Sequence, residues 1–203
     1  MADNKLLKTL KKLGATREEY VTDPYDQQSM YEDIAASSDN LEPEDIAAIA
    51  GVESNFGKNT KNMAGSRASG TFQMMPQTLK YLSERSPEAH EANPLREEAR
   101  LMKELIPQHE KELSITLGPD ADISATEVFV KHNLGNGAGK KLLRASKDTP
   151  IGEILSEDVI GANPSIYKGK NKSQVLDEIQ KRLKKKSSEF KFENRGPLGF
   201  LED

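Results

Sequence analysis

The clearest helix signal in the chain is the segment PEDIAAIAGVES at residues 43–54, and it decides the fold. Proline suits the first position of a helix, and the acidic Glu44 and Asp45 complement the positive end of the helix dipole. The apolar side chains then fall on one stripe of the helix, at Ile46, Ile49, Ala50 and Val52. The segment therefore predicts a largely buried helix that ends in Glu53-Ser54.

Helical patterns resume beyond this segment and fill most of the chain. A polar connection rich in Gly, Asn and Ser spans residues 55–70. Apolar periodicity then predicts helices over residues 76–84, 95–113, 124–134, 138–145, 151–155 and 173–185. Strand-like alternation never exceeds four or five residues. The sequence therefore predicts an all-α protein.

Both ends of the chain differ from this central part. Residues 5–13 place leucines at helical spacing, which favours a small amphipathic helix that packs on the domain or on a partner over one that binds a membrane surface. Residues 14–42 are acidic and polar. Residues 187–203 resemble an extended tail or docking peptide. We therefore expect a helical extension over residues 1–41, a domain over residues 42–186 and a C-terminal tail.

Composition excludes several classes of function. The chain has 203 residues, a net charge of −4 and no cysteine. No overall positive field attracts nucleic acid, and disulfides, thiolate metal sites and cysteine nucleophiles are excluded. Three histidines, His90, His109 and His132, are widely separated in sequence, which argues against a zinc enzyme. We expect no metal or organic cofactor, no membrane span and no secretory signal peptide.

Four short motifs carry the chemistry. They are VESNF at residues 52–56, SRASGTFQMMPQT at 66–78, HNLGNG at 132–137 and NPSIY at 163–167. Together and in this order, they resemble the soluble lytic transglycosylase family, which is related to goose-type lysozyme. The likeness is greatest to the branch found in phage particles and some bacteria, and it covers roughly residues 46–183.

The resemblance implies a lysozyme-like fold and a reaction. The substrate is the β-1,4 bond between N-acetylmuramic acid and N-acetylglucosamine in peptidoglycan. In this family a single glutamate, here Glu53, protonates the glycosidic oxygen and then deprotonates the C6 hydroxyl of the sugar. The N-acetyl group of the muramic acid acts as internal nucleophile, and a 1,6-anhydro sugar results without consumption of water.

The position of Glu53 suits a proton donor on physical grounds as well. Most glutamates at a helix end are ordinary exposed carboxylates. Here the negative end of the helix dipole, together with burial, predicts a raised pKa, which a general acid at neutral pH requires. Glycosidases usually employ two carboxylates. No second candidate stands out, because Glu84, Glu88, Asp120 and Asp122 lie in charged stretches typical of a solvated surface.

The remaining candidates are expected to bind substrate. Gln73 offers two donors and an acceptor, which suits an N-acetyl amide or the catalytic carboxylate, although a loop cap is the alternative. Phe72 is expected to floor a sugar subsite, and Tyr167 either walls the cleft or packs in the core. The other expected substrate-binding residues are Ser66, His132 and Asn133, where the family more commonly has Tyr-Asn in place of His132-Asn133.

Two alternatives to a transglycosylase stay open. A hydrolysing muramidase needs only that water replace the C6 hydroxyl. A virion structural or ejection protein could use the domain mainly as a scaffold and contact other virion proteins through its terminal extensions. The resemblance favours a phage origin, with the protein carried in the virion or made in the host cytoplasm as an endolysin. The expected partner is peptidoglycan in the host periplasm and cell wall.

Overall fold

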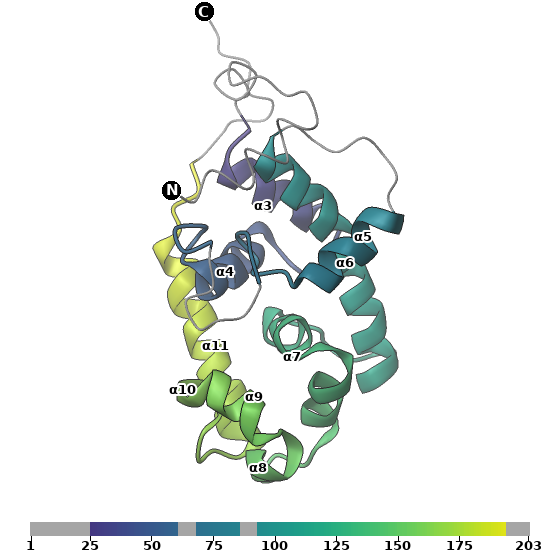
Figure 1. Ribbon diagram of the computed structural model, residues 1–203, viewed down its shortest axis with the longest axis vertical. Helices are drawn as coiled ribbons and strands as arrows, with labels where there is room; N and C mark the ends of the chain where they lie inside the picture. Colours follow the sequence, from purple (N-terminus) through teal and green to yellow (C-terminus); the bar gives the residue numbers. More distant parts are fainter. Residues whose placement is uncertain (1–24, 61–67, 86–92, 194–203) are drawn as a thin grey trace, which may run out of the picture.

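The computed structural model describes residues 25–60, 68–85 and 93–193 (Figure 1). Every regular element in these residues is a helix, which confirms the expected all-α fold. Extended pairing there is limited to two isolated antiparallel bridges, Ser69–Met74 and Pro150–Asn171. The helix expected over residues 5–13 lies outside the described residues, and so does Ser66. No helix in the described ranges has the length and apolar character that crossing a membrane requires.

The helix α4 (Pro43–Ser54) has the predicted bounds. Its start is fixed by a capping box, in which the side chains of Glu42 and Asp45 bind each other's backbone N–H groups. Residues 46–51 are buried. The helix ends because Asn55 adopts the left-handed conformation, with a φ of 53°. Phe56 and Gly57 also have positive φ angles, of 59° and 76°. The sharp turn directly follows Glu53-Ser54.

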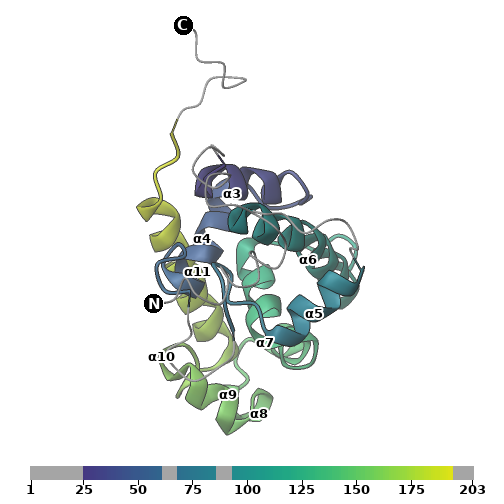
Figure 2. The same cartoon turned by 45° about the horizontal axis from the view of Figure 1, so that its top comes forward.

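Eight other helices make up the rest of the regular structure in the described residues. They are α3 (Gln27–Ala35), α5 (Pro76–Arg85), α6 (Pro94–Leu117), α7 (Ala125–Arg144), α8 (Ile151–Ile154), α9 (Glu157–Ala162), α10 (Pro164–Tyr167) and α11 (Lys172–Glu189). α4 packs against α3, α7 and α11, and α6 packs against α3, α5 and α7. Figures 1 and 2 show α11 beside α4, on the side away from α5. The helix that carries Glu53 is thus packed against three other helices.

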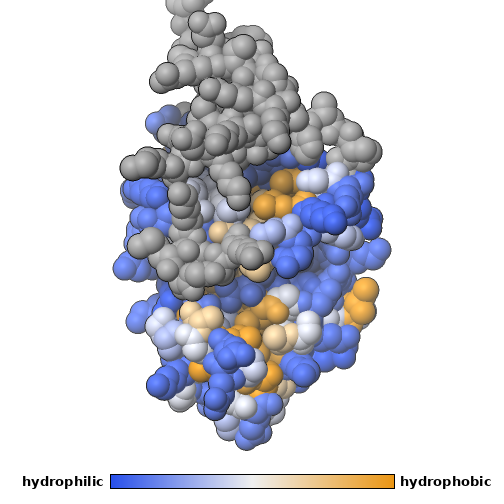
Figure 3. Space-filling model, viewed as in Figure 1, coloured by the Kyte–Doolittle hydropathy of each residue, from blue (hydrophilic) through white to orange (hydrophobic). Residues whose placement is uncertain are grey.

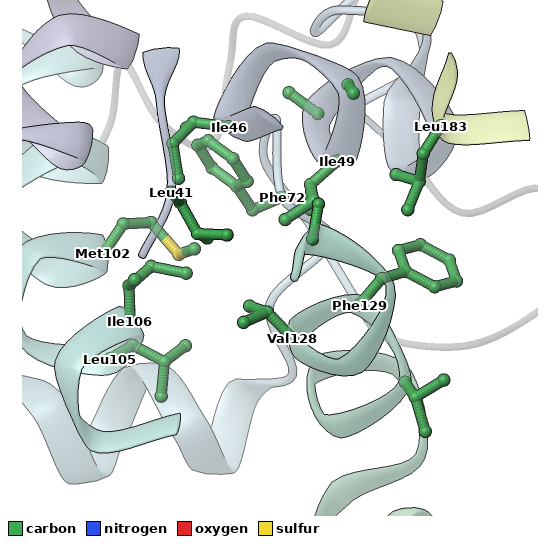
Figure 4. Close-up of a cluster of buried hydrophobic side chains, with 14 of the residues drawn as sticks. Leu41, Ile46, Ile49, Phe72, Met102, Leu105, Ile106, Val128, Phe129 and Leu183 are labelled. Carbon is green, nitrogen blue, oxygen red and sulfur yellow. The ribbon is translucent and has the colours of Figure 1, made fainter. Parts of the chain in front are cut away.

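The core forms where α4, α6 and α7 meet. Figure 4 shows Ile46 and Ile49 of α4, Met102 and Ile106 of α6 and Val128 of α7 gathered in one cluster. Each of these side chains is at most 1% exposed. Burial of one such side chain stabilises the fold by roughly 1.5–3 kcal/mol. This cluster holds the inner face of α4 in place.

Both ends of the described chain also join this core. α3 lies within the expected N-terminal extension, yet Met30, Tyr31 and Ile34 are fully buried among core residues. At the other end, α11 continues to Glu189. The ring of Phe190 then packs against Tyr31 and Phe56, with centroid distances of 5.0 and 5.5 Å. The division of the chain at residues 41 and 186 stays a prediction.

The helix α7 replaces two helices that the sequence predicts separately. Gly135 interrupts it with a non-helical conformation (φ 67°, ψ −172°), which only glycine adopts readily. The two predicted segments, 124–134 and 138–145, therefore correspond to the halves of one kinked helix. The kink directly follows His132 and Asn133, so it sets the direction in which the chain leaves them.

Candidate active site

Glu53 lies in the last turn of α4, and its carboxyl group is largely withdrawn from solvent. Its Oε1 atom is buried and receives no hydrogen bond from the described residues. Burial raises the pKa of Glu53, while the charge of His132 and a hydrogen bond from Asn133 act in the opposite direction. Burial thus shifts this carboxyl group toward its protonated form, which is the form that a proton donor needs.

Asn133 and Tyr167 are hydrogen-bonded to each other, and both interact with the carboxyl group of Glu53. The hydroxyl of Tyr167, on α10, donates to Oδ1 of Asn133, on α7, at 2.9 Å. Because this contact uses the amide oxygen, the amide nitrogen of Asn133 is the group left to interact with the Glu53 carboxyl group. Burial and the nearby Glu53 both raise the pKa of Tyr167, so its hydroxyl keeps its proton. Helices far apart in sequence thus converge on one carboxyl group.

His132 connects the site to the loop before α5. Its Nε2 atom lies 2.7 Å from the carbonyl oxygen of Phe72. A carbonyl only accepts, so Nε2 carries the proton and donates, and a neutral His132 has Nδ1 as its acceptor. The negative charge of Glu53 and the ring of His132 are close enough to interact electrostatically. His132 therefore bridges the loop and the site.

The ring of Phe72 corrects one sequence-based expectation. Phe72 is fully buried and packs edge-on against Tyr31 of α3, with ring centroids 6.4 Å apart. This packing leaves no ring surface for a sugar, so Phe72 does not floor a subsite through its side chain. Phe72 contributes its backbone carbonyl oxygen, which accepts a hydrogen bond from His132.

The side chain of Gln73 binds backbone groups of the loop that contains it. Its side-chain Nε2 donates to the carbonyl oxygens of Gly70 (2.9 Å) and Asn59 (3.4 Å), and its backbone adopts a positive φ of 49°. This is the loop-cap alternative that the sequence leaves open. Gln73 also lines a cavity that His132 borders, and its role in binding substrate stays a prediction.

Two cavities lie near these residues, one lined by His132 and the other by Tyr167. The first, of about 330 Å³, is bordered by His132 and by Met75 and Tyr81, whose side chains are 44% and 41% exposed. Its polar lining comes from Gln73, Gln77, Gln108, His109, Glu112, Lys131 and Asn136. The mixture of aromatic, thioether and amide groups suits a sugar ring with its acetamido group.

The second cavity is larger, about 1210 Å³, and lies among α8 to α11 with Tyr167 at its border. Apolar side chains reach the surface over this part of the molecule, at the lower end of the view in Figure 3. Size alone would favour this cavity as the site. We assign the chemistry to Glu53 and its neighbours Asn133 and His132 instead, because the buried carboxyl group of Glu53 interacts with both of them, and His132 lines the smaller cavity.

Two residues of this region are not predicted from the sequence. His109, on α6, is 9% exposed, and its ring packs edge-on against His132 with centroids 5.9 Å apart. Burial, more than the charges of His132 and Lys131, lowers the pKa of His109 to about 3, so it is neutral at working pH. Glu98, also on α6, is a second carboxylate with a pKa raised by burial. The described residues contain no cluster of three metal-binding side chains.

Comparison with known protein families finds one match. Residues 30–98 match the family model of the transglycosylase SLT domain. The match begins inside α3, includes Glu53 and the loop at residues 70–75, and ends in α6, whereas His132, Asn133 and Tyr167 lie beyond it. A search of the curated proteins finds no match. The fold is all-α and lysozyme-like, and the matched region supports the transglycosylase SLT family for this chain.

Proposed function

We propose that this chain is a peptidoglycan lytic transglycosylase, a lyase that cleaves the bond between N-acetylmuramic acid and N-acetylglucosamine. The single observation that carries the proposal is the setting of Glu53. Its carboxyl group is buried at the end of α4, has an oxygen without a partner among the described residues, and faces Asn133. The family match over residues 30–98 supports peptidoglycan as the substrate.

The reaction needs only one carboxyl group. Glu53 donates its proton to the glycosidic oxygen as the bond from that oxygen to C1 of the muramic acid breaks, while the acetamido oxygen bonds to C1. The Glu53 carboxylate then takes the proton of the C6 hydroxyl, O6 bonds to C1, and the acetamido oxygen leaves. Glu53 is protonated again, and the product has a 1,6-anhydro end. Asn133 orients the carboxyl group, and Tyr167 orients Asn133.

The other buried carboxylates of the described residues support a mechanism with one carboxyl group. Glu98 accepts a hydrogen bond from the backbone N–H of Thr71, and Glu110 accepts one from the backbone N–H of Asp39. Each therefore binds a loop, which is a structural role, whereas a second catalytic carboxylate would be a partner of Glu53 across the sugar. A retaining glycosidase would need such a partner at about 5 Å.

We also propose a phage origin, either as a virion-associated enzyme or as an endolysin that reaches the host cell wall. The likeness of the four motifs to the phage-borne branch supports this origin. Detection of the chain in purified virions would favour the virion-associated form, in which the terminal segments contact other virion proteins. Its presence in the lysate alone would favour an endolysin.

The substitution Glu53→Gln tests the catalytic proposal. It removes the transferable proton but keeps the size of the side chain, so we expect release of soluble fragments from purified peptidoglycan to fall about a hundredfold or more. Glu44→Gln, at the exposed start of the same helix, is the matched control and should retain full activity. Equal rates for Glu53→Gln and wild type would refute the proposal.

The masses of the released fragments distinguish the two possible reactions. A transglycosylase product is one water lighter than the product of hydrolysis. We expect fragments with 1,6-anhydro ends. Fragments with reducing ends alone would identify a hydrolysing muramidase that uses the same Glu53.

A further inference from the structure

The turn at residues 70–73 is held by three helices at adjacent backbone groups. From α4, the hydroxyl of Ser54 donates to the carbonyl oxygen of Thr71 at 2.7 Å. From α7, His132 donates to the carbonyl oxygen of Phe72 at 2.7 Å. Both of these helices also carry the reacting end of the site, since Ser54 follows Glu53 and His132 precedes Asn133. The position of the turn and the position of the site are therefore linked.

The third contact comes from Glu98 on α6. Its Oε1 atom accepts a hydrogen bond from the backbone N–H of Thr71 at 2.6 Å. The carboxylate lies so close to Gly70 that a Cβ atom there would be 2.0 Å from Oε1. Gly70 also has a φ of 84°, which favours glycine. The turn is thus shaped to receive this carboxylate.

We infer that Glu98 is a positioning residue, which fixes the turn at residues 70–73 and through it the placement of Ser54 and His132 beside Glu53. This inference rests on the proposed function, because it assigns Glu98 a part in the cleavage of glycan. Glu98 holds the backbone that Ser54 and His132 bind from the opposite side. Without the hydrogen bond from Thr71 to Glu98, the turn can shift, and Ser54 and His132 shift with it.

A second buried glutamate on the same helix offers a matched control. Glu110 is 5% exposed, and its carboxylate accepts hydrogen bonds from the Ser38 hydroxyl (2.5 Å) and from the backbone N–H of Asp39 (3.3 Å). It therefore binds a backbone N–H group, as Glu98 does, but in the loop that follows α3. Loss of either carboxylate removes a hydrogen bond to a loop, and only one of the two loops contacts the site.

The test compares Glu98→Ala, Glu98→Gln and Glu110→Ala on soluble glycan strands of peptidoglycan. We expect Glu98→Ala to lower kcat by about ten- to a hundredfold with a smaller change in KM, since small displacements of reacting groups cost this much. Glu98→Gln keeps an acceptor oxygen for Thr71 and should retain kcat within about threefold. Glu110→Ala should behave like wild type. Equal kcat for folded Glu98→Ala and Glu110→Ala would overturn the inference.

A second readout does not depend on activity. Amide ¹⁵N shifts and exchange rates of Thr71 and Gln73 should change in Glu98→Ala and stay unchanged in Glu110→Ala. If Glu98→Ala does not fold, Glu98→Asp, which withdraws the acceptor by one methylene, should give the same pattern. Wild-type protein without activity would refute the proposed function alone, whereas unchanged Thr71 and Gln73 amides would refute the positioning role.

Discussion

At the scale of the residue, the feature that suits Glu53 to catalysis also costs stability. Burial is the largest cause of its raised pKa, so the folded state favours the neutral carboxyl group more than the unfolded chain does. The stability that Glu53 contributes is therefore present below its unfolded pKa and is lost as the pH rises through its folded pKa. At neutral pH the ionised form is disfavoured in the fold, and a permanently neutral side chain avoids this penalty.

We accordingly expect Glu53→Gln to be more stable than wild type at neutral pH, by about 1 kcal/mol. The gain should disappear in acid below the ordinary carboxyl pKa of 4.5, where both side chains are neutral. Urea unfolding at several pH values measures this difference. If the variant is less stable than wild type at neutral pH, or if its gain in stability grows in acid, then ionisation of Glu53 does not destabilise the fold.

At the scale of the element, the kink in α7 directs the polar residues around the site. Gly135 breaks the helix two residues after Asn133. The chain then returns so that Asn136 binds the ammonium group of Lys131, which also pairs with Glu112. These three residues line the smaller cavity. The backbone of Gly135 thus determines the polar wall of that cavity.

We expect Gly135→Ala to lower the free energy of unfolding by about 2 kcal/mol, because a side chain is strained at a φ of 67° and a ψ of −172°. No atom lies within 4 Å of the added Cβ, so backbone strain is the cause rather than a clash. Gly137→Ala is the control. It also meets no atom within 4 Å, lies in the helix and should stabilise by about 0.5–1 kcal/mol. If Gly135→Ala unfolds at the same urea concentration as wild type, backbone strain at this position is refuted.

At the scale of the whole molecule, local signals predict the central helix and long-range packing explains what they miss. The bounds of α4 follow from its proline, acidic first turn and apolar stripe, all of which are local. α3 has only a few apolar residues, and its burial depends on α4 and α6. α3 is not predicted from its local sequence, and neither is the packing of the Phe72 ring against Tyr31.

In the site, too, local sequence predicts the residues of the motifs but not the contacts that depend on long-range packing. Glu53, Asn133 and Tyr167 come from short motifs, and the structure brings them together. Glu98 lies in a charged stretch that is typical of a solvated surface, and only the packing of α6 against the loop shows that its carboxylate is buried. The contact between His109 and His132 likewise depends on how α6 packs against α7.

The most direct test of the central claim is an NMR titration of the Glu53 carboxyl carbon in wild-type protein. Selective ¹³C labelling of glutamate, with the Glu53 signal identified by its absence in Glu53→Gln, gives the midpoint. A midpoint clearly above 4.5 is the predicted result, because burial at the end of α4 favours the protonated form. A midpoint at or below 4.5 would contradict the account of Glu53 as a proton donor held out of water.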